Sequence, residues 1–530
     1  MSQEALDALQ KTNFTHWDWA IAIGYLLISL LVGLWVKRYA VDMTNYITAG
    51  RGVGTWLGIA TMTGTELGLI TIMYSAEKGF KGGFAAFHIA IIAGFVTLFV
   101  GLTGFIVEPL RRFEVLTIPE FYEKRFGKPT RVFGGIVLAI GGILNMGLFL
   151  KVGSMFLVGV TGLSHTGWAL PTVMTVLLVL VLVYTVLGGM ISVIITDYIQ
   201  FVVLSFGMVL VSLLAIYTLG WDNIFHTVQD QMGEKGFDPL VAEGHFGPEY
   251  VMWMMVLGLA GCAIWPTAVA RALSMESTEA VKRMYRWSSL SFTVRFLIPY
   301  FWGICAFVFI ATQAPDLENL FFTSGEKGEE PKMNVLYATP IFLGRLLPAG
   351  ILGILTAAML AAFMSTHDSY LLCWSSVLTQ DVIAPLRKKP LTNKMRIGLT
   401  RGLIVVLGIY IWCWGMLYNG DDDIWDYMAI TGAVYFTGAF PLLVGGLYWK
   451  QASSFGALAS LLAGCSALLG LDKIRKGFNS VSQFLFGTPA DYWTAERVGL
   501  LSVVLTILVF VLGSLLVPDR KYPPKSEQNL

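Results

Sequence analysis

Charged residues are scarce in this 530-residue chain: Asp, Glu, Lys and Arg make up 13% of it, whereas hydrophobic residues make up 55%. Ordinary soluble domains carry about 25% charged residues. This deficit excludes a water-soluble globular protein. The formal net charge is only +1, so the overall balance does not indicate a nucleic-acid partner, and we predict none.

Cysteine is also sparse, and none of the cysteines shows the spacing of a metal site. The five are Cys262, Cys305, Cys373, Cys413 and Cys465, and all fall inside apolar runs. We therefore predict no disulfide framework.

Several sequence motifs are absent as well. There is no Gly-x4-Gly-Lys-Ser/Thr phosphate loop, which argues against an ATP-driven pump, and no His-Glu-x2-His metal site. We assign no catalytic residues and no enzymatic activity. The segment from Met1 to Trp17 lacks the basic start of a signal peptide, so we expect it to be retained.

Long apolar runs dominate what is present. A bilayer core about 30 Å thick needs about 20 apolar residues per helix. Thirteen runs approach or exceed this length, near residues 17–36, 53–74, 83–107, 132–160, 168–187, 192–218, 250–270, 288–312, 343–378, 398–418, 425–447, 454–470 and 496–517. We predict an all-α polytopic membrane protein with about 13 transmembrane helices.

The connections between these runs differ in basic content. If Met1 lies outside, every second connection is cytoplasmic and should collect Lys and Arg. These connections carry 23 of the 36 basic residues, including the clusters 111–131, 271–286 and 387–401. We predict an outer N-terminus and a cytoplasmic C-terminus, most simply in a plasma (inner) membrane.

Two of the predicted spans are interrupted, and they lie five spans apart. The run near 53–74 contains Thr61-Met-Thr-Gly-Thr-Glu-Leu-Gly68, and the run near 250–270 contains Trp265-Pro266-Thr267. Proline removes a backbone donor and disrupts a helix. Transporters built from inverted repeats place their binding site at such paired breaks. The alternative is a packing glycine and a simple kink.

Glu66 lies near the middle of the first interrupted run. A charge there costs several kcal/mol unless it is paired or hydrated, so Glu66 needs a partner, a cation or a proton. The other ionisable residues inside predicted spans are Lys151, Asp197, Arg295, Asp368, His88 and His367. For Lys151 we favour snorkelling or a structural pair, and for the two histidines a hydrogen-bonded interior position.

The segment Ala361-Ala-Phe-Met-Ser-Thr-His-Asp-Ser369 places oxygen-bearing side chains at three- and four-residue intervals. Such a spacing puts them on one helix face. Hydroxyl, carboxylate and carbonyl oxygens are hard ligands that suit an alkali cation better than a soft transition metal. A tight helix contact lined by serines is the alternative.

These residues resemble those of the sodium/solute symporter family, which includes sodium-coupled glucose, proline, pantothenate and sialic-acid transporters. The patches that carry the resemblance are Asn45–Arg51, Leu116–Phe126, Tyr184–Gln200 and Ala361–Ser369, with further support from Arg271-Ala-Leu-Ser and Gly446–Lys450. They occur in the family's order over most of the chain.

The resemblance implies a LeuT-like fold of five-plus-five inverted repeats. In this chain, residues 1–52 would form the outer N-terminus and an extra first helix, 53–220 the first repeat, 221–450 the second repeat with outer loops, and 451–530 two C-terminal helices and a cytoplasmic tail.

The family's sodium sites can be carried over by motif. The main site would use the broken first core helix and the eighth core helix, at Gly64, Leu67, Ala362, Ser365 and Thr366. This sequence has Thr-Gly-Thr-Glu where relatives commonly have small residues and asparagine. Some relatives hold a second sodium ion, for which the matching residues are Asp197, Asp368 and Ser369.

The substrate pocket departs from that of the sugar-transporting members. Four of their sugar-contacting positions fall at Ala90, Thr267, Arg295 and Met428. Only the cation is retained, so the sugar hydroxyls would lack partners and a hexose is disfavoured. Arg295 suits a carboxylate and Glu66 an ammonium group, unless these two residues serve only as a structural pair. Our candidate substrate residues are Glu66, His88, Thr267, Arg295 and Met428.

We therefore predict a sodium-coupled symporter that imports a zwitterion or small organic acid by alternating access. Its partners would be the substrate, sodium ions and the lipid bilayer. A sodium/sugar symporter is the first alternative, and a sodium-independent channel or transporter-like sensor is the second. The sequence does not predict the oligomeric state.

Overall fold

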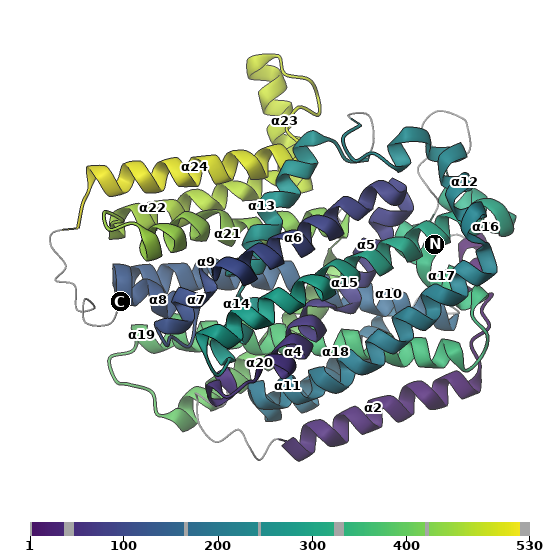
Figure 1. The fold of residues 1–530 in the computed structure, drawn as a ribbon, viewed down its shortest axis with the longest axis horizontal. Coiled ribbons are helices and arrows are strands. Elements are labelled where there is room, and N and C mark those ends of the chain that lie inside the picture. Colours follow the sequence, from purple (N-terminus) through teal and green to yellow (C-terminus); the bar gives the residue numbers. More distant parts are fainter. Residues whose placement is uncertain are drawn as a thin grey trace.

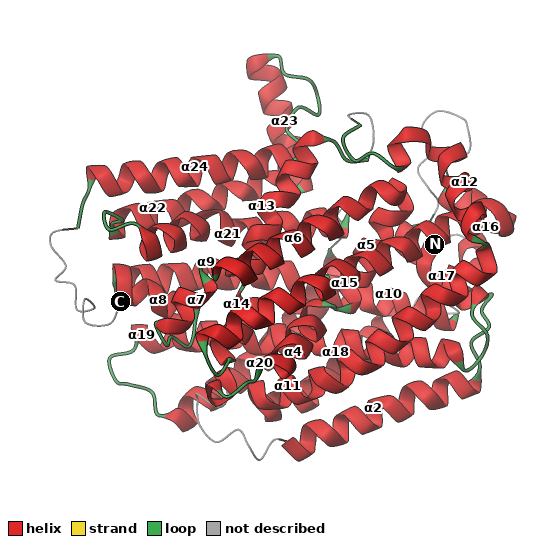
Figure 2. Cartoon of the chain, viewed as in Figure 1, coloured by secondary structure: helices red, strands yellow, loops and turns green. Residues whose placement is uncertain are grey.

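The computed structural model describes residues 3–36, 47–163, 168–241, 245–322, 333–418 and 423–519. Within these ranges the chain is helical (Figure 2), and the only β-pairing is an isolated bridge between Val53 and Met275. The predicted all-α class is confirmed.

The elements divide into long helices, shorter helices and single turns. The long helices are α2 (His16–Val36), α6 (Phe87–Thr103), α9 (Lys128–Met146), α11 (Ala169–Leu219), α13 (Pro248–Ile264), α15 (Thr278–Gln313), α18 (Ile351–Val377), α20 (Asn393–Leu417), α21 (Ile424–Tyr448) and α24 (Ala495–Leu516). The shorter helices are α1 (Gln3–Gln10), α4 (Thr55–Glu66), α5 (Leu69–Gly82), α7 (Val107–Arg112), α8 (Ile118–Phe126), α10 (Phe149–Thr161), α12 (Trp221–Met232), α14 (Pro266–Ser274), α16 (Pro315–Phe321), α17 (Ala338–Leu346), α19 (Ala384–Leu386), α22 (Ser454–Gly464) and α23 (Asp472–Phe486). The 3-10 turns are η2 (Ala49–Arg51), η3 (Gly83–Ala86), η4 (Gly233–Gly236), η5 (Val335–Tyr337) and η7 (Cys465–Gly470), and η6 (Leu378–Ile383) is a π-helical turn.

Nine helical segments in the described residues are long and apolar enough to cross a membrane, and a tenth is reached if the bent pair 454–470 and 472–486 counts as one. The predicted total of thirteen is therefore not confirmed. Part of the difference lies in α11, which contains both apolar stretches predicted as spans five and six.

Apolar side chains on the outer helices face away from the bundle. On α11, Val202, Phe206, Val209 and Leu213 are all more than half exposed, and they recur every three or four residues. Helix α24 repeats this pattern with Leu501, Leu505, Leu508 and Leu512. Contiguous apolar stripes of this kind are not tolerated in water. They are the lipid-facing surfaces of an integral membrane protein.

The helices run mainly along the long axis of the molecule, with α2 along one edge and α22 and α24 along the opposite edge (Figure 1). Helix α18 lies inside and is buried over nearly its whole length. It packs against α2, α4, α5, α11 and α20. A central helix of this kind can present polar groups that never meet lipid.

The predicted inner connections within the described residues gather at one end of the bundle, where α7, α8 and α19 lie, whereas α12 and α16 lie at the other end (Figure 1). The stretch 37–46 and the tail after residue 519 lie outside the described residues. Ion pairs join these connections, with Lys282 Nζ 3.2 Å from Glu108 Oε2 and Arg131 Nε 3.0 Å from Asp381 Oδ1. Which end faces the cytoplasm stays a prediction, as does the division into two inverted repeats.

Helices α5 and α15 approach backbone to backbone. A Cβ atom added to Gly79 would lie 2.1 Å from the carbonyl oxygen of Tyr300, and one added to Gly303 would lie 1.9 Å from that of Ala76. Glycine is required at both positions, and the close approach holds α15 beside the interrupted helix.

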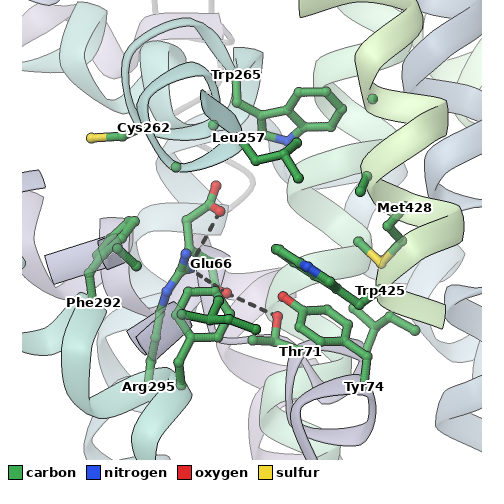
Figure 3. A pocket seen from close by; sticks show the side chains of 18 of the residues that line it. Glu66, Thr71, Tyr74, Leu257, Cys262, Trp265, Phe292, Arg295, Trp425 and Met428 are labelled. Carbon is green, nitrogen blue, oxygen red and sulfur yellow. Dashed lines mark hydrogen bonds and ion pairs between the residues drawn. The ribbon is translucent and has the colours of Figure 1, made fainter. Parts of the chain in front are cut away.

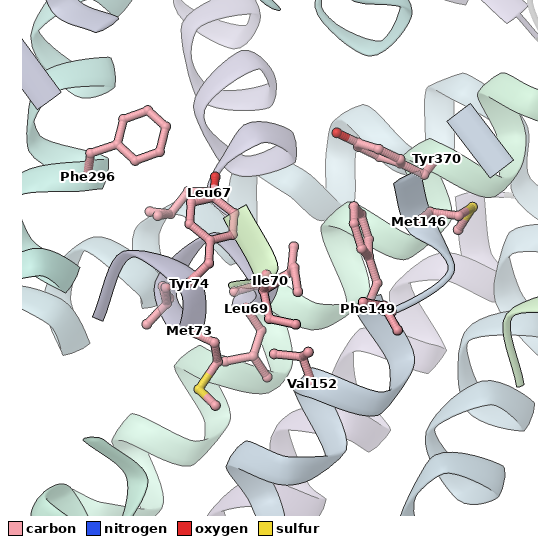
Figure 4. Packing of buried hydrophobic residues seen from close by; sticks show 14 of the residues in the cluster. Leu67, Leu69, Ile70, Met73, Tyr74, Met146, Phe149, Val152, Phe296 and Tyr370 are labelled. Atoms are coloured by element: carbon pink, nitrogen blue, oxygen red, sulfur yellow. The ribbon is translucent and has the colours of Figure 1, made fainter. Parts of the chain in front are cut away.

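Leu69, Ile70 and Met73 form the start of α5 and lie near Phe149 and Val152 of α10 (Figure 4). All five are buried. This apolar packing fixes α5, the second half of the interrupted helix.

Candidate functional site

The first helix break lies where the sequence predicts it. Helix α4 ends at Glu66, Leu67 takes φ −98° and ψ 67°, Gly68 is extended, and α5 begins at Leu69. A helix end leaves its last carbonyl oxygens without backbone partners. The break therefore exposes main-chain acceptors in the interior of the bundle.

Helix α18 supplies hydroxyl groups to these acceptors. Ser365 Oγ lies 2.9 Å from the carbonyl oxygen of Gly64 and 3.1 Å from that of Ala362. Thr366 Oγ1 lies 3.1 Å from the carbonyl oxygen of Thr65. A Cβ atom on Gly68 would lie only 2.2 Å from Thr366 Oγ1, so the missing side chain of Gly68 makes the approach of α18 possible.

The structure thus brings Gly64, Ala362, Ser365 and Thr366 together, and Leu67 lies at the break itself. Ser365 and Ala362 are wholly buried and Thr366 is nearly so. Uncharged hydroxyl and carbonyl oxygens around a buried point suit a hard cation. The geometry fits the donor set expected for a sodium ion.

The second helix break also lies where the sequence predicts it. Helix α13 ends at Ile264, Trp265 is extended with φ −68° and ψ 127°, and α14 begins at Pro266. This short helix carries two residues into the interior: Thr267, whose Oγ1 donates to Glu66 Oε1 at 2.7 Å, and Arg271.

Arg271 lies among the residues predicted to form a second sodium site. Its Nη2 atom donates to Thr65 Oγ1 at 2.5 Å and to Ser369 Oγ at 2.6 Å, and lies 3.4 Å from Asp197 Oδ2. Asp197 Oδ2 also accepts from Thr61 at 2.6 Å and from Thr65 at 3.0 Å. Sequence reasoning used Arg271 as a family marker and as one of the basic residues of an inner connection. It missed that Arg271 is buried and faces Asp197.

Asp368 adds a second buried carboxylate beside this group. It is wholly buried, its Oδ1 accepts from Ser369 Oγ at 3.2 Å, and its Oδ2 has no hydrogen-bond partner among the described residues. Asp368 and Asp197 thus place two buried carboxyl groups near the single guanidinium group of Arg271.

We predict that Arg271→Gln strongly destabilises the fold. Removing one partner of a buried ion pair costs about 3–5 kcal/mol. Asp197→Asn in the same chain should recover part of this loss, because it removes the uncompensated charge. The measurement is the apparent melting temperature in detergent for both single variants and the double variant.

The control is a partly exposed pair near the surface, Arg497 with Glu249, whose Nε and Oε2 atoms lie 2.6 Å apart. Exposed pairs contribute about 1 kcal/mol or less. If Arg271→Gln lowered the melting temperature no more than Arg497→Gln does, the Arg271–Asp197 pair would not support the core.

A cavity of about 140 Å³ lies beside the two breaks. Glu66 and Arg295 form its polar wall, and both side chains point into the space shown in Figure 3. Arg295 Nη1 donates to the carbonyl oxygen of Glu66 at 2.6 Å and lies 3.5 Å from Glu66 Oε2. The two predicted charges therefore meet, although their carboxylate–guanidinium contact is long.

These contacts use only part of the hydrogen-bonding capacity of the Arg295 guanidinium group. Its guanidinium carbon lies 3.8 Å from the ring centroid of Phe292 and 4.5 Å from that of Phe296. Such cation–π contacts hold the planar group in place. Its Nε atom has no hydrogen-bond partner among the described residues, and its side chain is 8% exposed. A buried donor without a partner is the expected state of a group that binds a ligand's oxygen atoms.

Aromatic and other apolar side chains form most of the rest of the cavity, and Thr71, Thr97 and Asn145 add further polar groups to its lining. The rings of Tyr74 and Trp425 lie 4.6 Å apart, and Trp265 Nε1 donates to the Tyr370 hydroxyl at 3.0 Å. All four residues line the cavity, together with Met428. Sequence reasoning missed these four aromatic residues because aromatic residues are common in every span, so composition alone did not single them out.

The remaining sequence-predicted substrate residues have different places. Met428 lines the cavity. Thr267 does not line it but donates a hydrogen bond to Glu66, which does. His88 is not among the lining residues. Its Nδ1 lies 2.6 Å from the carbonyl oxygen of Ala85, and its ring packs 4.9 Å from that of Phe246.

An ion cluster joins α5 to the start of α21, next to the cavity-lining residues Tyr74 and Trp425. Lys78 Nζ, one turn beyond Tyr74, lies 2.8 Å from both Asp423 Oδ2 and Asp426 Oδ2. Lys81 and His245 also contact Asp423. Burial would raise the pKa of Asp423, but these three basic side chains hold it well below its ordinary value. Asp423 therefore stays ionised at neutral pH, and its contacts tie α5 to the start of α21.

Comparison with known proteins agrees with this geometry. The model of the Sodium:solute symporter family matches residues 46–464. The chain is 26% identical over 468 residues to the high-affinity proline transporter PutP of Bacillus subtilis, covering 83% of this chain and 89% of that protein. It is 24% identical over 483 residues to the sodium/proline symporter of Staphylococcus aureus, covering 87% of each chain.

Solved structures support the same fold. A Na+-coupled sialic acid symporter in a substrate-bound outward-open state superposes with a TM-score of 0.74 at 20% identity, covering 96% of this chain and all of that chain. The nucleobase-cation-symport-1 family transporter Mhp1 superposes with a TM-score of 0.53 at 14% identity, covering 91% of this chain and 97% of that chain.

Proposed function

Because this chain belongs to the sodium:solute symporter family, we propose that it couples the entry of sodium to the import of an amino-acid-type zwitterion. The family consists of transporters and not of enzymes. The observation that carries the proposal is the pairing of α18 hydroxyl groups with the carbonyl groups of the α4–α5 break, directly beside a cavity that holds Glu66 and Arg295.

Sodium would bind at Gly64, Leu67, Ala362, Ser365 and Thr366. A ligand shifts a conformational equilibrium in favour of the conformation that it binds more tightly. An ion bound by both α4 and α18 therefore stabilises the conformation in which these two helices lie together. In the proposed cycle this is the outward-facing state. Because Glu66 follows Gly64 by two residues, sodium binding also orders the polar wall of the substrate cavity.

A second sodium ion is proposed at Asp197, Asp368 and Ser369. Two buried carboxyl groups lie near one guanidinium group there, so ionisation of both would require a further cation, which we propose is sodium. Sodium titration of uptake should then give a Hill coefficient near 2, and a coefficient of 1 would assign the remaining charge to a bound proton.

The substrate class follows from the walls of the cavity. Arg295 would bind the substrate carboxylate and Glu66 its ammonium group, and the wall made by Tyr74, Trp425 and Met428 would contact an apolar side chain. Sugar hydroxyl groups would find few partners on such a surface. The two proline-transporting relatives favour an amino acid as well.

Uptake of labelled proline and of a panel of other amino acids, carboxylates and sugars into proteoliposomes tests the proposal. We expect accumulation with an inward sodium gradient and none when choline replaces sodium. Uptake that is indifferent to sodium would identify a channel. Sodium-driven uptake of sugars alone would contradict the zwitterion. The membrane orientation proposed, with the N-terminus outside and the C-terminus cytoplasmic in the plasma membrane, is tested by protease accessibility of tags at the two ends.

A further inference from the structure

Helix α23 departs from the direction of the transmembrane helices. The chain reaches Gly470 at the end of η7 and then turns by 88° into α23 (Asp472–Phe486). Figure 1 shows α23 standing out from the edge of the bundle, whereas α22 and α24 run along that edge. A helix at a right angle to spanning helices lies in the plane of the membrane.

Contacts with the segment that leads into α24 fix the position of α23 along the direction of the transmembrane helices. Asn479 Nδ2 donates to the carbonyl oxygen of Trp493 at 3.1 Å, and the Trp493 amide donates to Asn479 Oδ1 at 2.9 Å. Trp493 Nε1 donates to Ser482 Oγ at 2.9 Å. These bonds hold α23 beside Ala495, where α24 begins.

Helix α24 has 22 residues, which at 1.5 Å per residue is about 33 Å long. This length matches a hydrocarbon core of about 30 Å. The first turn of α24 therefore lies at one face of the bilayer, and α23 lies at the same level.

One face of α23 is an apolar stripe in which Phe478 packs against Trp493, with ring centroids 5.3 Å apart, while its other members are exposed. Ile474, Phe478, Val481 and Leu485 follow at intervals of four, three and four residues, which places them on one side of a helix. Ile474, Val481 and Leu485 are 44%, 54% and 60% exposed, and the neighbouring Phe484 is 88% exposed. The buried face is a different one, formed by Asp472, Asn479 and Ser482.

Polar and basic side chains occupy the side opposite the apolar stripe. Lys473, Lys476, Ser480 and Gln483 are exposed there, and Lys476 Nζ lies 3.0 Å from Asp472 Oδ2. Tyr492 and Trp493, at the base of the helix, are residue types that favour the membrane–water boundary. An apolar face, a basic polar face and low net hydrophobicity characterise a helix that lies in the interface.

We propose that α23 is an interfacial helix whose stripe, Ile474, Phe478, Val481 and Leu485, inserts among phospholipid acyl chains at the face of the bilayer where α24 begins. A second protein is less suited than lipid to cover this stripe. A stable protein interface takes about 20–30 residues on each side, far more than this stripe presents. A lipid surface needs no matching shape and is already present around α24.

Spin labels on adjacent residues test this placement in the whole protein. Val481→Cys and Leu485→Cys carry the label on the apolar stripe, and Ser480→Cys carries it on the polar side as a matched control. Each is made with Cys413→Ser, because Cys413 is the exposed cysteine among the described residues. The unsubstituted Cys413→Ser protein measures background labelling.

In phosphatidylcholine proteoliposomes, we expect labels at 481 and 485 to be several-fold more accessible to oxygen, which concentrates in the bilayer, than to a water-soluble nickel chelate. The label at 480 should show the opposite preference. Equal accessibility to the chelate at all three positions would place α23 in water and overturn the proposal. Protection of 481 and 485 from both reagents would also overturn it and identify a protein contact instead.

Discussion

Replacing Ser365 with alanine is expected to raise the sodium concentration for half-maximal uptake about tenfold or more, while uptake at saturating sodium is largely retained. The hydroxyl group lies between the carbonyl oxygens of Gly64 and Ala362. A bond from a neutral group to a charged one contributes about 1.5–3 kcal/mol, and each 1.4 kcal/mol is a factor of ten in affinity. Sodium titration of substrate uptake in proteoliposomes measures the shift.

The same helix offers a matched control for the loss of a buried hydroxyl group. Ser375 is wholly buried, and its Oγ donates to the carbonyl oxygen of Leu372 at 3.1 Å. This bond has the spacing and length of the bond between Ser365 and Ala362. Ser375→Ala should therefore leave the sodium dependence unchanged. An equal shift in both variants would mean that Ser365 acts only on the packing of α18.

Two substitutions of Thr366 separate the effect of its hydroxyl group from the effect of its side-chain size. Thr366→Ser keeps the oxygen, and Thr366→Val keeps the shape but removes it. We expect only the valine variant to lose sodium affinity. If both variants lost affinity equally, contact of the Thr366 side chain with Gly68 would account for the result in place of ion binding.

Replacing Arg295 with alanine is expected to abolish the preference for substrates that carry a carboxylate. Truncating one partner of a buried charged pair costs about 2–5 kcal/mol, so the affinity for a zwitterion should fall by about 30-fold or more. The measurement compares an amino acid with its uncharged amide, by inhibition of labelled uptake. The wild-type protein should favour the acid strongly, and Arg295→Ala should bind the two compounds nearly alike.

A structural pair between Arg295 and Glu66 is the alternative to substrate binding, since Nη1 already contacts Glu66. Glu66→Gln combined with Arg295→Gln separates the two roles, because it neutralises both charges at similar volume. If the charges serve only each other, the double variant should transport nearly as well as wild type. If they bind a zwitterion, it should fold with normal stability but fail to discriminate the acid from the amide.

Much of the local structure was predictable because its causes are local. The α4–α5 break follows from glycines and threonines in an apolar run, and the α13–α14 break follows from Pro266, since these residues act on their own turn of helix. The placement of Ser365 and Thr366 opposite the break at Gly64 and Leu67 was expected from the family resemblance, whereas the contact of Thr366 with the carbonyl oxygen of Thr65 was not. Their contacts span 301 residues of sequence, so periodicity alone had no means to pair them.

Other features needed the folded chain. Arg271 meets Asp197 across 74 residues, and Lys78 meets Asp423 across 345. Neither pairing follows from the residues beside those charges. The aromatic residues that line the cavity, Tyr74, Trp265, Tyr370 and Trp425, belong to segments far apart in the sequence. Helix α23 was not foreseen, because its apolar stripe is too short and too polar in composition to be read as a span.

The sequence by itself determined that this protein lies in a bilayer, where two of its helices break, and several of the charges in its interior. It did not place Arg271 or Lys78 there. Hydropathy, proline and glycine act within a few residues, so no neighbour is needed to read them. The tertiary structure alone decided which of those charges meet and which are left for a ligand. Burial and pairing depend on helices that approach from distant parts of the chain, as α18 approaches the α4–α5 break.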